Sequence, residues 1–257
     1  MPWFNREKAP ATNCVVVGDT FSGHGEICQA LNQHPKVICH GDLIGPDESV
    51  RQEAHESYFG TSRGFQDWFR GKEISAEQYL SNKVFDNNLH AEKVVGLRLD
   101  YSAIIRYDLW EYLERQSRGG DFCLIHVWRN PIASYLARQS KPTAGPGKLT
   151  SMLDTDTTAE MVNKLVSFVS DMLALQSKVR NLTYDYAEVP YHEFVLDSDT
   201  TTRRMLQYLG LDYEGAIPRL KLRPFFEILK DRLTHEDKIR EAMPMDMRKF
   251  LDEEPIF

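Results

Sequence analysis

The sequence predicts an α/β protein in which a central parallel sheet is flanked by helices. The first observation is the run 13–18, which is apolar on both faces, as strands buried in parallel sheets are. The second is that similar runs follow at 37–40, 94–101 and 122–128, with helical spacing between them. Strands that alternate with helices imply right-handed crossovers, which place a ligand site at the carboxyl ends of the strands.

Each strand candidate leads into an element of recognisable type. The glycine-rich turn 18–25 opens into a helix that His34 and Pro35 end. Residues 43–93 are rich in aromatic side chains and predict a helical insertion, whereas 140–158 is rich in Gly, Pro and Thr and predicts a mobile loop. The remaining expected elements are helices at 26–33, 104–113, 131–139, 160–179 and 200–209, and a short strand at 189–191.

Length and composition exclude several classes of protein. A chain of 257 residues that is 42% hydrophobic and 27% charged can bury a core of its own, so we expect a single domain over 1–257. No apolar run approaches the ~18 residues of a transmembrane helix, and no apolar leader precedes the first strand. We therefore expect a cytoplasmic protein. Four scattered cysteines without a C-x-x-C pair indicate neither a disulfide framework nor a metal site.

The charge of the chain is unevenly distributed. The formal net charge of −7 argues against nucleic acid or another polyanion as partner. Two stretches, 122–153 and 215–226, contain no Asp or Glu but hold four and three basic residues. Without those seven, 24 basic residues face 38 acidic ones, a balance of −14. Two compact cationic stretches indicate a local anion site, with chance clustering on a solvated face as the alternative.

The turn after the first strand has the form of a phosphate cradle. Gly18 and Gly23 are five residues apart between a strand and a helix, so backbone N–H groups and the helix N-terminus can face an anion. A Walker A loop continues with Lys and Ser or Thr, where this chain has His24 and Gly25. The missing lysine argues against an NTPase. A glycine-rich turn that binds nothing is the alternative.

Four motifs in order resemble the sulfotransferase superfamily, which uses 3′-phosphoadenosine 5′-phosphosulfate (PAPS). Residues 16–25 resemble the family's 5′-phosphosulfate loop, and 30–35 (Ala-Leu-Asn-Gln-His-Pro) resemble the exit of the following helix. His126–Pro131 resembles the 3′-phosphate motif, a strand that ends in Arg-Asn-Pro. The segments 189–194 and 206–211 resemble two later family motifs. The likeness covers about residues 15–211 and implies a P-loop NTPase-like sulfotransferase fold.

The resemblance also implies a reaction and a set of ligands. A sulfuryl group passes from PAPS to a hydroxyl or similar acceptor, the 3′,5′-bisphosphate (PAP) is released, and no metal is expected. Arg129 is expected at the 3′-phosphate, because its planar fork suits bidentate oxygens, and Tyr191 near the adenine. The cofactor-binding residues expected on this basis are Gly18, Ser22, Gly23, His24, Gly25, Arg129, Ser134, Tyr191, Lys221 and Arg223.

Two positions depart from the family pattern. Phe21 stands where relatives have Lys or Arg, and Ala137 stands where they have Ser. Ser134 or Arg138 could substitute for the missing serine. Arg98 lies inside the strand 94–101, where an unpaired charge is costly, so we hypothesise that it supplies the cation that Phe21 cannot. An ion pair with a neighbouring carboxylate is the alternative for Arg98.

Three residues are candidates for the base that takes the acceptor's proton. Asp42 follows the second strand, where many relatives place a catalytic Glu, and ranks first. His40 ranks second because its ordinary pKa suits a base near neutral pH. Asp100 ranks third, at the place of a catalytic His in cytosolic relatives. The interpretation is therefore a catalytic set of Asp42, His40, Asp100 and Arg98.

The acceptor is expected to be small or apolar. The insertion 43–93 and the loop 140–158 are natural walls of an acceptor pocket, and the insertion has abundant aromatics but few basic residues. Two rival functions remain. A nucleotide kinase-like phosphoryl transferase is disfavoured by His24 and Gly25. A nucleotide-binding protein that kept the fold and lost the chemistry is favoured by Phe21 and Ala137.

Overall fold

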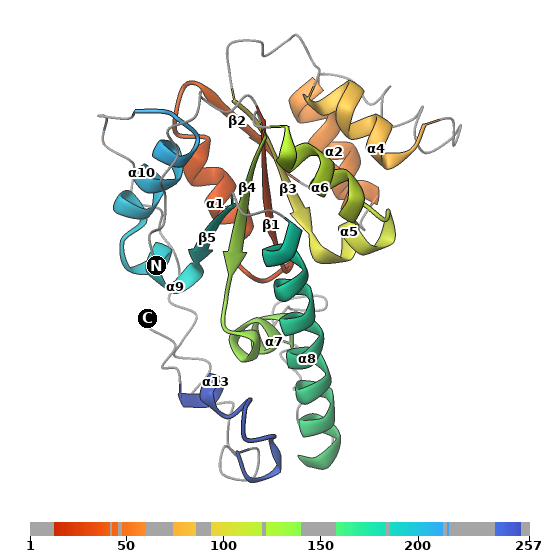
Figure 1. Cartoon of the computed structure of the whole chain (residues 1–257), viewed down its shortest axis with the longest axis vertical. Helices are drawn as coiled ribbons and strands as arrows, with labels where there is room; N and C mark the ends of the chain where they lie inside the picture. Colours follow the sequence, from red (N-terminus) through yellow and green to blue (C-terminus); the bar gives the residue numbers. More distant parts are fainter. Residues whose placement is uncertain are drawn as a thin grey trace.

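A five-stranded parallel sheet forms the centre of the protein (Figure 1). The structure, a computed structural model, describes residues 13–41, 43–45, 48–59, 74–85, 94–119, 122–139, 158–182, 186–212, 215 and 240–252. The strands are β1 (Asn13–Gly18), β2 (Val37–His40), β3 (Val94–Asp100), β4 (Phe122–Trp128) and β5 (Tyr186–Pro190), in the order β2-β3-β1-β4-β5. Every pair of neighbours is parallel. The predicted α/β fold with a parallel sheet is confirmed.

The register of the sheet brings distant residues to one edge. Gly18, the last residue of β1, lies level with Asp100, the last residue of β3. On the other side of β1, Val17 lies level with His126, two residues before the end of β4. The turn after β1 and the residues that follow β3 and β4 therefore meet at the carboxyl edge of the sheet, which is where parallel α/β sheets bind ligands.

Helices cover both faces of the sheet (Figure 1). Side chains alternate along β1, so that Val16 packs on one face with α1 (His24–Leu31) and α10 (Ser198–Tyr208). Val17 packs on the other face with α5 (Tyr101–Arg106), α6 (Trp110–Arg118) and α8 (Thr158–Leu182). Val15, Val16 and Val17 are all fully buried, which explains why the strand is apolar on both faces.

One predicted helix is two. The spacing of apolar residues over 104–113 predicts a single helix, but α5 ends at Arg106 and α6 begins at Trp110. Between them Asp108 has a φ of 50°, in the left-handed region that short polar residues tolerate better than others. The Leu109 amide donates to Ile104 O at 3.0 Å, and Leu109 is 1% exposed. The break keeps Ile104 of α5 and Leu113 of α6 in the core, whereas Ile105 is 54% exposed.

A second correction concerns Tyr191. The segment 189–191 was expected as a strand, but β5 ends at Pro190 and Tyr191 begins α9 (Tyr191–Leu196). Pro190 occupies the N-cap position with an extended backbone (φ −63°, ψ 120°), so it closes the strand and opens the helix. Tyr191 therefore projects from the first turn of a helix, not from the side of a strand.

The described parts of the insertion 43–93 are helical. They contain α2 (Glu48–Phe59), α4 (Ala76–Tyr79) and a π-helical segment, Leu80–Phe85. Ser75 begins α4 with a capping box, in which its hydroxyl accepts from the amide of Gln78. The rest of the insertion, and all of the expected loop 140–158 except Thr158, lie outside the described residues. No helix in the described ranges is both long and apolar enough to cross a membrane.

Helix α7 (Pro131–Gln139) is anchored at its start by Asn130. The side-chain oxygen of Asn130 accepts from the Ile132 amide at 2.9 Å, which satisfies one of the free amides of the first turn. Its side-chain nitrogen donates to Phe250 O at 2.8 Å, in α13 (Lys249–Asp252). Asn130 thus joins the end of β4, the start of α7 and the C-terminal part of the chain.

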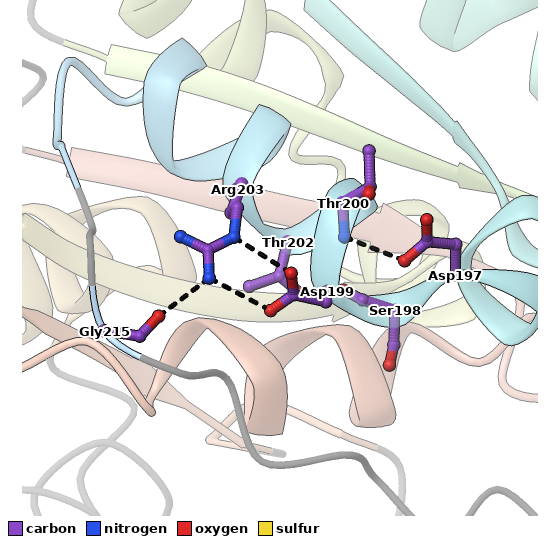
Figure 2. Close-up of polar contacts among 7 residues, drawn as sticks. All are labelled: Asp197, Ser198, Asp199, Thr200, Thr202, Arg203 and Gly215. Carbon is purple, nitrogen blue, oxygen red and sulfur yellow. Dashed lines mark hydrogen bonds and ion pairs between the residues drawn. The ribbon is translucent and has the colours of Figure 1, made fainter.

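Helix α10 carries a polar network at its N-terminus (Figure 2). Asp197 caps the helix, because its Oδ1 accepts from the Thr200 amide at 3.0 Å. Arg203 bonds Asp199 through Nε at 3.0 Å and reaches Gly215 O through Nη2 at 2.8 Å. Gly215 is the first residue of the basic stretch 215–226 and its only described member. The hydrogen bond from Arg203 therefore holds the first residue of that stretch beside α10.

Gly96, in the middle of β3, marks a close approach to buried thiols. A Cβ there would lie 2.7 Å from Cys14 Sγ and 3.1 Å from Cys39 Sγ. Both cysteines are at most 1% exposed, so neither side chain can move into solvent. We expect Gly96→Ala to lower the free energy of unfolding, measured by urea denaturation, by about 2 kcal/mol through overpacking.

Gly41 provides the matched control for this substitution. A Cβ there meets nothing within 4 Å, and Gly41 follows a strand of the same sheet. Gly41→Ala should therefore change the free energy of unfolding by less than about 0.5 kcal/mol. Equal losses in the two variants would mean that crowding by the thiols is not the cause.

Candidate functional site

The turn after β1 is closed by Ser22. Its amide and its hydroxyl both donate to Asp19 O, at 2.9 and 2.8 Å. Ser22 is 1% exposed, and a Cβ on Gly18 would overlap its hydroxyl. Gly18 therefore allows the turn to close, and the hydroxyl proton of Ser22, expected to serve a ligand, is used within the turn itself.

The turn ends in an open helix N-terminus. Gly23 has a φ of 88° and stands at the N-cap of α1 without a side-chain cap. A Cβ on Gly23 would overlap the ring of Tyr191, so this ring packs directly on the glycine backbone. The first amides of α1 are left for a partner outside the helix. Uncapped amides at a helix N-terminus are the arrangement that binds phosphate groups.

Arg129, directly after β4, is held against this turn. Its Nη1 donates to Phe21 O at 2.7 Å, and its guanidinium carbon lies 5.0 Å from the centroid of the Tyr191 ring. Burial lowers the pKa of Arg129, but a guanidinium stays charged in proteins. The residue that lacks a cationic side chain, Phe21, therefore holds a cation through its backbone.

Arg98 brings a second cation to the same turn. Arg98 lies in β3, level with Val16 of β1, and both residues belong to the sheet face that α1 covers. A Cβ on Gly25 would come within 2.7 Å of Arg98 Nη1, so the guanidinium lies against the first turn of α1. The charge of Arg98 also acts on the carboxylate of Asp100, so both alternatives for Arg98, a cation for the turn and a partner for a carboxylate, remain predictions.

His24 and Asp100 form a buried pair beneath the turn. His24 Nε2 contacts Asp100 Oδ1, and Asp100 Oδ2 accepts from Thr20 Oγ1 at 3.2 Å. The two residues are 2% and 6% exposed. Burial raises the pKa of Asp100, but the hydrogen bond from His24 and the nearby positive charges outweigh it, so the pKa lies below its usual value. Asp100 is therefore ionised at neutral pH.

Two further charged residues lie at the site: Asp19, which no sequence pattern singled out, and Arg138, which was named as a substitute for the missing serine. Asp19 accepts a hydrogen bond from the Phe21 amide at 3.3 Å. Burial raises the pKa of Asp19, and the negative charge of Asp100 raises it further. The positive charge of Arg138 lowers it. Arg138 lies one helical turn after Ser134 on α7. The Oγ of Ser134 is buried and has no hydrogen-bond partner among the described residues. The sequence pointed to Ser134 and Arg138 through their places near Ala137, whereas nothing in it singled out Asp19.

Several expected residues lie apart from this cluster. His40 is fully buried in β2 and lies level with Leu97, so it projects to the face opposite Arg98 and Asp100. Asp42, Lys221 and Arg223 lie outside the described residues. Within the described ranges no group of three His, Cys, Asp or Glu side chains could hold a metal ion.

Comparison with known proteins points to one fold. The chain matches no protein-family model and no curated protein sequence. It is similar to the crystal structure of a sulfotransferase from Alicyclobacillus acidocaldarius, with a TM-score of 0.51 and 14% identity over 96% of this chain and 94% of that one. The chain therefore has a sulfotransferase-like fold.

Two further solved structures are similar at a lower level. The sulfotransferase domain of the Synechococcus PCC 7002 olefin synthase has 15% identity and a TM-score of 0.42, over 100% of this chain and 88% of that one. Sulfotransferase STF9 from Mycobacterium avium has 14% identity and a TM-score of 0.43, over 97% and 70%.

Proposed function

We propose that this protein is a PAPS-dependent sulfotransferase that acts on a hydroxyl of a small or apolar acceptor. The observation that carries the proposal is the arrangement of Arg129, Tyr191 and Gly23 around one turn. The arginine bonds the backbone of the turn and lies over an aromatic ring, and that ring packs on the turn's own glycine. The cation suits one phosphate of a nucleotide, and the aromatic ring suits its adenine. The helix N-terminus suits the second phosphate of the same nucleotide.

The residues fit the cofactor in their chemistry. The uncapped amides of α1 would hold the 5′ group, Arg129 the 3′-phosphate, and Tyr191 would stack on the adenine. The buried Ser134 Oγ, which has no partner in the described structure, would gain one at the 3′-phosphate. When bound, PAPS supplies the sulfuryl group and a bisphosphate as leaving group.

The charges of the site suit sulfuryl transfer. The reaction depends on in-line positioning and on positive charge near the leaving group, as phosphoryl transfer does. Arg98 lies against the first turn of α1, and Arg129 is bonded to Phe21 O in the same turn. Two guanidinium groups therefore flank the place where a Walker loop would carry its lysine.

Two rival functions stay open to experiment. A kinase-like phosphoryl transferase would prefer ATP to the bisphosphate, and His24 in place of the Walker lysine disfavours it. A binding protein that has lost the chemistry would hold the bisphosphate without turnover, or hold no nucleotide at all.

Titration calorimetry with the 3′,5′-bisphosphate, and with ATP in comparison, tests the proposal. We expect the bisphosphate to bind at least about 10-fold more tightly than ATP, a difference of about 1.4 kcal/mol. Arg98→Ala should weaken bisphosphate binding by about 10-fold. Arg118→Ala is the control, because it removes only an exposed ion pair with Glu114, and it should leave the affinity unchanged. A preference for ATP, or no binding of either nucleotide, would overturn the proposal.

A further inference from the structure

We propose that His24, oriented by Asp100, accepts the proton of the acceptor hydroxyl during transfer. The inference rests on the proposed function and assigns its base to a residue of the turn itself. It differs from the expectation that Asp42, His40 or Asp100 performs this step, and it gives Asp100 the role of a positioning residue.

Hydrogen bonding fixes the tautomer of His24. An ionised carboxylate only accepts hydrogen bonds, so the contact between Nε2 and Asp100 Oδ1 places the ring proton on Nε2. In the neutral imidazole the other nitrogen, Nδ1, then carries a free lone pair. Nδ1 is buried and has no hydrogen-bond partner in the described part of the chain. Buried polar atoms without partners are rare, so this one indicates a group that the bound reactants supply.

The location of His24 suits a base for this reaction. It is the first residue of α1 and lies between Gly23 and Gly25, beside the amides that would hold the sulfate end of the cofactor. Asp100 is a poor base, because its hydrogen bonds and the nearby positive charges hold the pKa of its carboxyl below the usual value. His40 projects to the opposite face of the sheet.

Charged groups of both signs surround the pair. Asp100 and Arg98 approach from β3, and Asp19 acts on Asp100 from the turn. When Nδ1 takes the proton, the carboxylate of Asp100 faces an imidazolium and stabilises it, as the acid does in Asp–His pairs of hydrolases. The new positive charge arises beside the turn while negative charge develops on the leaving phosphate.

The step balances as follows. The acceptor oxygen forms a bond to sulfur while the bond between sulfur and the 5′-phosphate oxygen breaks. The electron pair of the broken bond goes to the bisphosphate. The acceptor's proton moves to His24 Nδ1 and is later released to solvent. No oxidant, reductant or metal takes part.

Nitrogen NMR of histidine-labelled protein tests the tautomer without turnover. We expect the Nδ1 of His24 to be unprotonated and the Nε2 to carry hydrogen at neutral pH. Asp100→Asn should remove this preference, whereas Thr20→Val, which leaves the His24 contact intact, should keep it. A proton on Nδ1 in the unsubstituted protein would overturn the proposal.

Slow transfer to water, measured as release of bisphosphate from PAPS, tests the chemistry without a known acceptor. His24→Gln should slow release at least about 100-fold and abolish the fall in rate at acid pH, with bisphosphate affinity changed less than about threefold. Arg118→Ala should release bisphosphate at the unsubstituted rate. If His24→Gln binds bisphosphate and keeps the normal rate and pH profile, the base is another residue and the proposed function stands. If the unsubstituted protein binds no bisphosphate, the proposed function itself fails.

Discussion

Replacing Arg129 by alanine should weaken binding of the 3′,5′-bisphosphate by at least about 100-fold, a loss of roughly 3 kcal/mol. The guanidinium is partly buried against the turn, bonded to Phe21 O and placed over the Tyr191 ring. Its charge is therefore partly desolvated and already oriented before a ligand arrives, which strengthens a phosphate contact. Titration calorimetry at fixed salt measures the change.

Two further variants separate charge from geometry at this position. Arg129→Lys keeps the charge but loses the planar fork, so affinity should fall by an intermediate factor of about 10. Tyr191→Phe keeps the ring beneath the guanidinium and should bind within about threefold of the unsubstituted protein. An alanine variant that bound the bisphosphate as tightly as the unsubstituted protein would show that Arg129 does not contact the ligand.

The sheet could be predicted from the sequence because buried parallel strands have a pattern of their own. The runs 13–18, 37–40 and 122–128 coincide with β1, β2 and β4. Most of their residues are buried on both faces of the sheet, as the pattern of a parallel strand requires. Arg98 could also be singled out, because a charge inside such a strand needs a partner or a function.

The side-chain pairing of the site could not be predicted in this way. His24 and Asp100 are 76 residues apart, and they meet because β1 and β3 end level with each other. Apolar patterns do not reveal register between strands that are distant in sequence. The break at Asp108 and the start of α9 at Tyr191 depend likewise on backbone angles at single residues, which tertiary packing sets.

Acid should destabilise the protein well before its carboxylates are protonated, because two buried histidines are held neutral. His126 lies inside β4, where the Tyr101 hydroxyl is 2.5 Å from its Nε2, and burial lowers its pKa to about 4. His55 lies in α2 against the Tyr79 hydroxyl, and burial lowers its pKa to about 4 as well. Charged neighbours have smaller effects than burial. The charge of Glu188 raises the pKa of His126 and that of Arg180 lowers it, and the charge of Arg51 lowers the pKa of His55.

The direction of the effect follows from proton uptake. Between pH 6.5 and about 4 the unfolded chain protonates both histidines while the folded protein does not. The unfolded state is therefore stabilised relative to the folded protein as the pH falls, and the free energy of unfolding decreases by about 1.4 kcal/mol per pH unit for each histidine. Full stability is present above about pH 6.5, and each histidine removes on the order of 3 kcal/mol by pH 4.

Urea denaturation at a series of pH values from 4.5 to 7 measures this slope. His126→Gln and His55→Gln should each reduce the slope by about half, because glutamine takes up no proton in the unfolded state. Tyr101→Phe and Tyr79→Phe are the matched controls: each removes the hydroxyl partner but leaves the histidine buried, and burial is the main cause of the lowered pKa. They should lower stability at every pH and keep the slope. A slope that vanished in the tyrosine variants and persisted in the glutamine variants would show that the histidines are not the groups that titrate.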